Sequence, residues 1–326
     1  MKMYRSFLLA ALAAAALAGQ PAFGQTKWNL PAAYPADNPH SENLALFAKD
    51  VADATGGKLQ ITVHPGASLF KAPDIKRAVQ TGQAQIGEVL ISIHENEDPM
   101  FGIDVIPFLA TSYPQAKKLW EVSKPAIEKK LAAQGLMVLF AVPWAPQGIY
   151  AKKDLNTIED MKGLKWRAYN VGTAKIGELV GAQSVTVQAA ELPQALATGV
   201  VNSFISSGGT GYDSKVWESL DHFYDTQAWI PKNITFVNKA AFDKLDKSEQ
   251  AAVLKAAATA ETRGWKMWED KSQWYLDQLK AKGMKVEAPS PALKAGFEKI
   301  GAELTADWLK KAGPEGQAII AAYKKQ

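Results

Sequence analysis

Arg167 is the side chain in this sequence whose type and position best suit the binding of an anion. Residues 165–169 alternate polar and large side chains, as a strand does, and residues 170–173 indicate the start of a helix. Arg167 is therefore expected at the carboxyl end of a strand, where ligands gather in open α/β sheets. A guanidinium there can donate two parallel hydrogen bonds to a carboxylate, and a helix N-terminus adds attraction for negative charge. The alternative interpretation is a surface arginine paired with a nearby glutamate.

A glycine-rich stretch and a group of aromatic residues belong to the same region of the chain. Residues 206–211 read Ser-Ser-Gly-Gly-Thr-Gly after a predicted strand and could bind an anion through backbone N–H groups. We favour an ordinary strand-to-helix turn that lines the cleft, with Ser206 in it. Core packing is the expected role for most of the aromatic residues, and those at strand ends beside Arg167 are candidates for pocket walls. These aromatic residues are Trp144, Tyr150, Trp166, Tyr169, Phe204 and Trp229.

Signals for enzymatic chemistry are weak by comparison. Glu88 lies at the far end of a predicted strand, near the expected ligand, but it has no evident partner for acid–base catalysis. The sequence contains no cysteine, no G-x-S-x-G motif and no P-loop. We therefore predict no catalytic residue, no metal site and no cofactor. The four histidines lack metal-ligand spacing and are more typical of surface or helix-capping positions: His40, His64, His94 and His222.

The elements that must position these side chains begin after a segment with the pattern of a secretory signal peptide. Lys2 and Arg5 precede the apolar run 7–18, and cleavage is expected after Gly24. The run is too short to span a bilayer. We therefore expect an exported, periplasmic protein. The net charge of +4 is not the footprint of a nucleic-acid-binding protein.

The rest of the chain alternates strand and helix patterns, which predicts an α/β fold. The first unit is expected to begin as a doubly wound sheet, and residues 136–142 suit a strand covered on both faces in a parallel sheet. The expected strands cover residues 28–30, 59–63, 84–90, 136–142, 165–169, 184–187, 200–205, 234–237 and 284–286. The expected helices cover residues 39–55, 73–81, 113–133, 175–180, 191–198 and 246–281, followed by two more near the end.

Two domains and a bracing helix are predicted from this pattern. A helix of about 35 residues would be about 50 Å long, too long for one small domain, so we expect it to brace both. The chain is expected to cross between domains near residues 143–148 and 231–233, which would act as hinges. We predict a signal peptide at 1–24, domain I at 25–145 with 233–265, and domain II at 146–232 with 266–326.

Five segments, in their order and spacing, give the chain a resemblance to a known family. The chain resembles the periplasmic solute-binding proteins of the tripartite ATP-independent periplasmic (TRAP) transporters, of the DctP type. The segments are Gly66–Phe70, Gly82–Glu88, Asp160–Arg167, Glu191–Asn202 and Phe236–Lys239.

The resemblance implies two α/β domains that close over an organic anion, with a membrane permease as partner. It implies that Arg167 pairs with the ligand carboxylate and that Glu88 lines the pocket. Many family members carry a second arginine where this chain reads Gln147 to Tyr150, and an asparagine where it has Ser206. These differences favour a monocarboxylate over a dicarboxylate, unless Lys71 supplies a compensating charge. The candidate ligand-binding residues are Arg167, Glu88, Lys71, Gln147, Tyr150, Trp144, Tyr169, Ser206, Tyr34 and Phe204.

Capture of an organic acid for a TRAP permease is therefore the predicted function. Two alternatives stay open at the level of the sequence. One is a secreted enzyme acting on a small organic acid with Glu88 as base, and the other is a sensory binding protein that signals to a membrane receptor.

Overall fold

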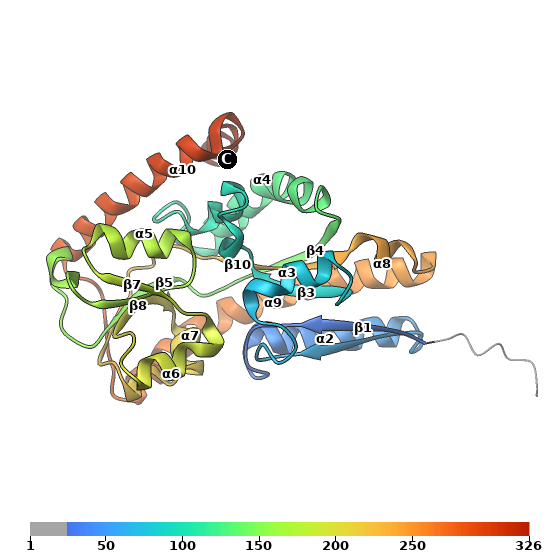
Figure 1. The fold of residues 1–326 in the computed structure, drawn as a ribbon, viewed down its shortest axis with the longest axis horizontal. Coiled ribbons are helices and arrows are strands. Elements are labelled where there is room, and N and C mark those ends of the chain that lie inside the picture. The colour runs from blue at the N-terminus through green and yellow to red at the C-terminus, as the bar shows by residue number, and fades with distance from the viewer. Residues whose placement is uncertain (1–24, 326) are drawn as a thin grey trace, which may run out of the picture.

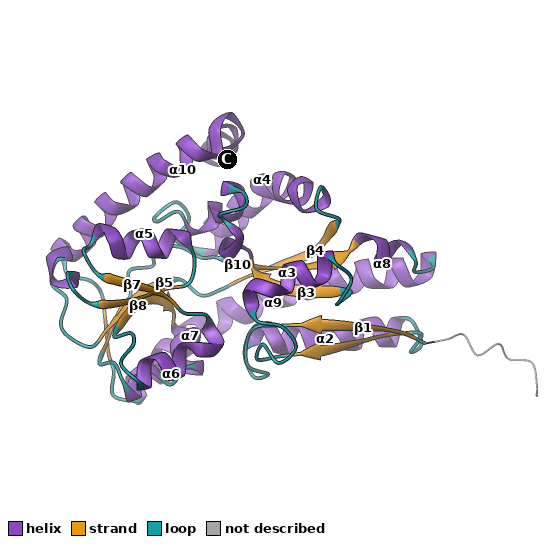
Figure 2. Ribbon diagram, viewed as in Figure 1, coloured by secondary structure: helices purple, strands orange, loops and turns teal. Residues whose placement is uncertain are grey.

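Three sheets divide the chain into two halves within residues 25–325, the part that this computed structural model describes (Figure 1). The first half holds a two-stranded sheet, β1-β2, and a three-stranded sheet, β3-β10-β4. The second half holds a six-stranded sheet of order β11-β9-β5-β8-β6-β7. Figure 2 shows helices packed around these sheets, with α9 (Lys247–Ala281) passing from one half to the other.

The first half consists of the elements at the start of the chain and of a later segment that returns to it. In chain order they are β1 (Thr26–Pro31), α2 (Pro39–Ala54), β2 (Leu59–His64), α3 (Ala72–Gln80), β3 (Ile86–Leu90), the 3-10 helices η1 (Ile91–His94) and η2 (Pro99–Val105), α4 (Tyr113–Ala132), β4 (Leu136–Pro143), β10 (Lys232–Asn238) and α8 (Lys239–Asp243).

The second half is built mainly from the stretch between β4 and β10. Its elements are β5 (Gln147–Ala151), η3 (Ile158–Met161), β6 (Lys165–Ala168), α5 (Val171–Leu179), β7 (Gln183–Thr186), η4 (Ala189–Glu191), α6 (Leu192–Ala197), β8 (Ser203–Ser207), α7 (Gly208–Asp213), η5 (Val216–Glu218), β9 (His222–Tyr224) and β11 (Lys285–Glu287).

The predicted sheet of the first half is wrong in its pairing, although its early strands lie close to where they were expected. No doubly wound sheet forms there, because β10 inserts between β3 and β4 and pairs antiparallel with both. Helices α4 and α9 both contact β4, so the strand is covered as in a parallel sheet. The continuous apolar sequence of β4 indicates this burial, but it does not indicate whether the neighbouring strand runs parallel or antiparallel.

Helix starts follow the capping signals of the sequence. Asn38 caps α2 by accepting a hydrogen bond from the His40 N–H at 2.8 Å, and Pro39 occupies the first turn. Asp246 and Glu249 form the predicted capping box of the long helix α9 (Lys247–Ala281).

The long helix α9 braces both halves, as predicted. It packs against α2 and β4 in the first half and against α7 and β11 in the second. The last helical segment, α10 (Pro291–Lys325), contacts α4 and η2 as well as α5 and η3 (Figure 1). It consists of two helices that meet at Gly313, whose φ of 58° lies in the left-handed region that glycine adopts readily.

The two chain crossings between the halves lie side by side. The Trp144 N–H donates to the Pro231 carbonyl at 2.8 Å, and the Gln147 N–H donates to the Trp229 carbonyl at 3.0 Å. Both crossings fall in or beside the segments expected as hinges. The domain boundaries given above remain a prediction, which the strand content of the three sheets supports.

None of the helices in residues 25–325 is long and apolar enough to cross a membrane. The predicted signal peptide, residues 1–24, lies outside the described part of the chain.

Candidate functional site

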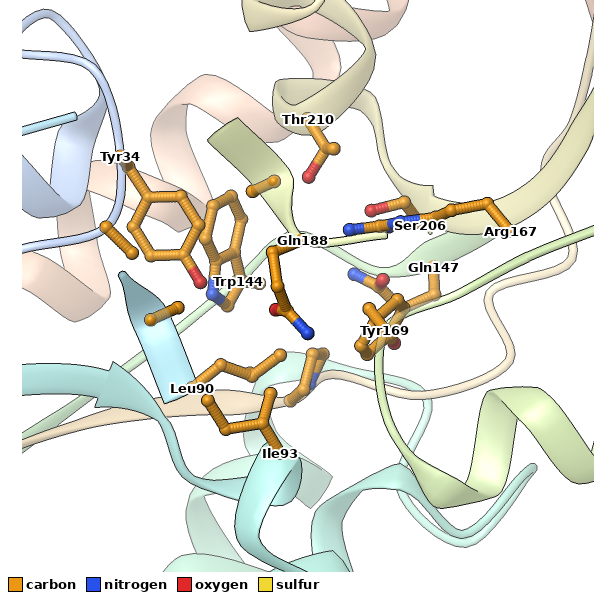
Figure 3. A pocket seen from close by; sticks show the side chains of 14 residues that line it. Tyr34, Leu90, Ile93, Trp144, Gln147, Arg167, Tyr169, Gln188, Ser206 and Thr210 are labelled. Carbon is orange, nitrogen blue, oxygen red and sulfur yellow. The ribbon is translucent and has the colours of Figure 1, made fainter. Parts of the chain in front are cut away.

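A cavity lies between the two halves (Figure 3). Its wall consists mainly of residues at the ends of strands, where the chain leaves a sheet and enters a loop or a helix. The lining residues are Ala33, Tyr34, Ala72, Leu90, Ile93, Trp144, Gln147, Arg167, Tyr169, Gln188, Ala189, Ser206, Thr210 and Pro231. Six of the ten predicted ligand-binding residues are among them: Tyr34, Trp144, Gln147, Arg167, Tyr169 and Ser206.

Arg167 is a buried cation without a carboxylate partner among the described residues. Its side chain comes from β6 and is 3% exposed, and its Nε donates to the Val187 carbonyl at 2.8 Å. Burial lowers the pKa of the guanidinium to about 10, so it stays protonated at neutral pH. Figure 3 shows the guanidinium directed into the cavity beside Ser206. The site therefore presents a buried positive charge that no described carboxylate neutralises.

Aromatic rings hold the guanidinium in place. Its central carbon lies 4.9 Å from the ring centroid of Tyr169 and 5.8 Å from that of Phe204. The Tyr169 hydroxyl accepts a hydrogen bond from the Trp229 indole at 3.3 Å, and burial raises the pKa of Tyr169 above its usual value. The next residue, Asn170, caps α5 through the Thr173 N–H at 2.8 Å, which fixes the chain on the far side of Tyr169.

The other polar side chains of the cavity are neutral amides and hydroxyls. Gln147 begins β5 and donates from Nε2 to the Ala145 carbonyl at 2.8 Å, while its Oε1 accepts no hydrogen bond from the described residues. Gln188 and Ser206 make no side-chain hydrogen bond within residues 25–325, and Thr210 contacts the Ser207 hydroxyl at 3.1 Å. These groups can donate to or accept from a polar ligand without adding charge.

The opposite wall is apolar and aromatic. Tyr34 and Trp144 meet edge to face, with ring centroids 4.7 Å apart, and the Trp144 indole donates to Asn233 Oδ1 at 2.8 Å. Leu90 and Ile93 complete this side, as Figure 3 shows. A compact ligand body with one charged end therefore fits between the aromatic wall and Arg167.

Glu88 lies behind the aromatic wall, which corrects the expectation that it lines the pocket. Its carboxylate is 2% exposed and lies 3.1 Å from Nδ1 of His40. The His40 ring packs in turn against Trp144, with a centroid separation of 4.4 Å. Glu88 therefore supports the wall and does not reach the cavity.

Lys71 lies outside the cavity, because its ammonium group pairs with Glu191 at 2.9 Å on the exposed surface. Tyr150 and Phe204 also fail to line it. They lie in register on β5 and β8, below the strand ends, where their rings stack 4.5 Å apart and Phe223 covers Tyr150. Phe204 supports Arg167 from beneath, and the Tyr150 hydroxyl donates to the Ser207 carbonyl at 2.9 Å.

The histidines do not take the surface positions expected of them, except for His64. His40, His94 and His222 are buried, and burial lowers the pKa of His94 to about 4. Within residues 25–325 no group of three histidine, cysteine, aspartate or glutamate side chains is arranged to hold a metal ion.

Gln188 is a polar lining residue that sequence reasoning missed, although a signal for it existed. It follows β7 almost directly, and β7 pairs parallel with β6, the strand of Arg167. The rule that ligands gather at the carboxyl ends of strands applies to both strands. Thr210 belongs to the turn at residues 206–211 that was expected to line the cleft. Leu90 and Ile93 carried no comparable signal, because apolar residues are common at ordinary strand and helix ends.

Three polar contacts join the two halves around the cavity. Lys71 pairs with Glu191, Asn38 Nδ2 donates to Asp213 Oδ2 at 2.7 Å, and Asn170 Nδ2 donates to the Ser92 hydroxyl at 3.0 Å. The structure therefore describes a closed arrangement, in which a ligand would be surrounded from both halves.

Comparison with known proteins places this geometry in one family. Residues 32–311 match the family described as bacterial extracellular solute-binding protein, family 7 (DctP). A solute-binding protein of Albidiferax ferrireducens is 27% identical over 66% of this chain and 65% of its own length. The chain thus spans about two thirds of that relative.

Two solved structures are more similar. DctP6 of Bordetella pertussis, described as an extracytoplasmic solute receptor binding pyroglutamic acid, is 58% identical with a TM-score of 0.91. The match covers 92% of this chain and all of that one. A TRAP solute-binding protein from a marine metagenome, described as specific for pyroglutamate, is 48% identical with a TM-score of 0.91, covering 93% of this chain and 99% of that one.

Proposed function

Because this chain belongs to the DctP family of bacterial extracellular solute-binding proteins, we propose that it is a periplasmic receptor that binds pyroglutamate and delivers it to a TRAP permease. Pyroglutamate is a five-membered lactam that carries a single carboxylate. The proposal therefore includes the expectation from the sequence that the ligand is a monocarboxylate.

Arg167 carries the proposal. A buried guanidinium with no carboxylate partner among the described residues is costly to hold, and a ligand carboxylate would supply both the counter-charge and two parallel hydrogen bonds. An anion bound there is also surrounded by both halves of the protein, so binding favours closure.

The lining of the cavity supports a lactam as the rest of the ligand. The lactam N–H and C=O need one acceptor and one donor, and the amides of Gln147 and Gln188 offer both. The ring methylenes would pack against Trp144 and Leu90. No acidic side chain lines the cavity, and Arg167 is the one basic residue among the lining residues described, so one carboxylate matches its charge. The two similar structures described as binding pyroglutamate support the same ligand.

Binding is favoured over catalysis by the position of Glu88. As a base it would have to touch the ligand, yet its carboxylate is 2% exposed and lies behind Tyr34 and Trp144. The periplasmic location and the permease partner rest on the family to which the chain belongs. A sensory role would use the same cavity and differ in the membrane partner.

Calorimetry on the mature protein tests the proposal. The protein should first be unfolded and refolded, to remove ligand retained from the cell. Pyroglutamate is expected to bind one to one and to raise the melting temperature by several degrees at a hundred times its Kd, because ligand at that concentration stabilises the folded state by about 2.7 kcal/mol.

Two control ligands separate the contributions of the anchor and the lactam. 2-Pyrrolidinone keeps the lactam without the carboxylate, and proline keeps the ring and the carboxylate without the lactam carbonyl. Both are expected to bind at least tenfold more weakly. Absence of heat and of stabilisation at millimolar pyroglutamate would contradict the proposal.

A further inference from the structure

We propose that Asp213 is a positioning residue for closure, and that protonation of its carboxyl group strengthens ligand binding by stabilising the closed arrangement. The inference rests on the proposed function, since it concerns the same cavity and the same ligand. Asp213 ends α7 in the second half, and its partner Asn38 precedes α2 in the first half.

The hydrogen bond that joins them has a fixed direction. Asn38 Oδ1 is occupied by the His40 N–H at 2.8 Å, because Asn38 caps α2. Its Nδ2 is therefore the atom that faces the other half, and it donates to Asp213 Oδ2 at 2.7 Å. This bond can form only when the halves are together, so closure replaces water around the carboxylate by one neutral amide.

The surroundings of Asp213 disfavour its charge in the closed form. Burial raises the pKa of its carboxyl group to about 6, with a further contribution from the like charge of Asp37 and opposing contributions from the Asn38 hydrogen bond and Lys271. Lys271 is shared, since it pairs with Glu42 at 3.1 Å. The titratable groups near Asp213 are Asp37 before α2, Glu42 on α2, Lys271 and Tyr275 on α9, Tyr212 beside it on α7, and Tyr150 on β5.

Asp213 also lies beside the cavity proposed for the ligand. It lines an outer cavity that shares Tyr34, Trp144 and Thr210 with the cavity of Arg167. Residues of both halves line the outer cavity, among them Pro35 from the first half and Pro193 from the second. A charge at this position therefore acts on closure over the ligand and not on the carboxylate anchor.

The sign of the pH effect follows from this arrangement. A carboxyl group whose pKa is higher in the closed form than in the open form takes up protons on closure, so closure becomes more favourable as the pH falls. With an ordinary aspartate pKa of 3.8 in the open form and about 6 in the closed form, affinity should rise about tenfold between pH 7.5 and pH 5. Arg167 stays protonated and the ligand carboxylate stays ionised over this range.

Titration of pyroglutamate at pH 5, 6, 7 and 7.5 tests the proposal in the wild type and in Asp213→Asn. The wild type should bind about tenfold more tightly at pH 5 than at pH 7.5. Asp213→Asn keeps an acceptor for Asn38 without the charge, so it should bind at least tenfold more tightly than the wild type at pH 7.5 and vary less than twofold with pH.

Glu191→Gln is the matched control, because it neutralises the other carboxylate that joins the halves. Its partner Lys71 is exposed and holds the pKa of Glu191 below its usual value, so the variant should keep the pH dependence of the wild type. A wild-type affinity that is flat with pH would overturn the proposal, as would an Asp213→Asn variant with an unchanged slope.

The role of Asp213 can be tested even if the proposed function is wrong. If pyroglutamate does not bind at any pH, closure can still be followed in the free protein by small-angle scattering. The radius of gyration should then be smaller at pH 5 than at pH 7.5 in the wild type and independent of pH in Asp213→Asn. Equal radii in the wild type at both pH values would overturn the role of Asp213.

Discussion

Replacing Arg167 by alanine is expected to raise the Kd for pyroglutamate at least about thirtyfold and to leave the protein folded. The loss of a buried, charge-assisted pair costs about 2–5 kcal/mol, because the ligand carboxylate remains buried without its partner. The free protein should tolerate the change, since the guanidinium donates one hydrogen bond, to the Val187 carbonyl, and pairs with no described carboxylate. Calorimetry measures the affinity, and circular dichroism with thermal unfolding checks the fold.

Arg167→Lys is the matched control for this variant. The lysine keeps the charge but cannot reproduce the planar fork that donates two parallel hydrogen bonds, so affinity should fall to a value between those of the wild type and Arg167→Ala. If Arg167→Ala binds pyroglutamate as the wild type does, the carboxylate is bound elsewhere.

Succinate is expected to bind at least a hundredfold more weakly than pyroglutamate, a difference of about 2.7 kcal/mol. Its first carboxylate would occupy Arg167, and its second would be buried among neutral groups such as Gln147, Gln188 and Ser206. A buried charge without a partner costs several kcal/mol. Competition of succinate against bound pyroglutamate measures the ratio.

The interpretation of succinate binding depends on whether Lys71 can pair with the second carboxylate. The structure holds its ammonium group on Glu191, outside the cavity, with 73% of the side chain exposed. Lys71→Ala should therefore leave the ratio between succinate and pyroglutamate unchanged. Succinate binding tighter than every monocarboxylate tried would refute the monocarboxylate proposal, and loss of that binding in Lys71→Ala would identify Lys71 as the second anchor.

Local signals in the sequence were sufficient to find the centre of the site. Arg167 was identified by a strand pattern, a helix start and the chemistry of the guanidinium, all within ten residues. Ser206 was found from the turn that follows a predicted strand. Gln147 came from the family resemblance, as the residue that stands where many members carry an arginine. A strand pattern followed by a helix start locates the carboxyl end of the strand. In α/β proteins, ligands bind at the edge of the sheet where the strands have their carboxyl ends.

The sequence did not show which side chains near the strand ends line the cavity and which are covered by other side chains. Tyr150 and Gln147 lie three residues apart on β5, yet one is stacked against Phe204 and the other lines the cavity. Glu88 was expected at the ligand because its strand ends there, but its carboxylate lies against His40, whose ring packs on Trp144. The predictions for Tyr150 and Glu88 failed for the same reason. Each residue is covered by side chains that are distant in the sequence, and the periodicity of the sequence does not identify those side chains.

Long-range pairing is the other limit. Strand β10 follows β4 by about ninety residues in the chain and still pairs with it, which replaces the expected doubly wound sheet by an antiparallel one. Helix α9 was predicted correctly because its caps and its length are local properties. That it braces both halves followed from its length alone.

A crystal structure of the protein with pyroglutamate tests the central claim most directly. We expect one ligand in the cavity between the halves, with both carboxylate oxygens about 2.7–2.9 Å from nitrogen atoms of the Arg167 guanidinium. The lactam should lie on the side of Gln147, Gln188 and Trp144. A ligand whose carboxylate is bound by other residues, with Arg167 left without an anion, would contradict the account.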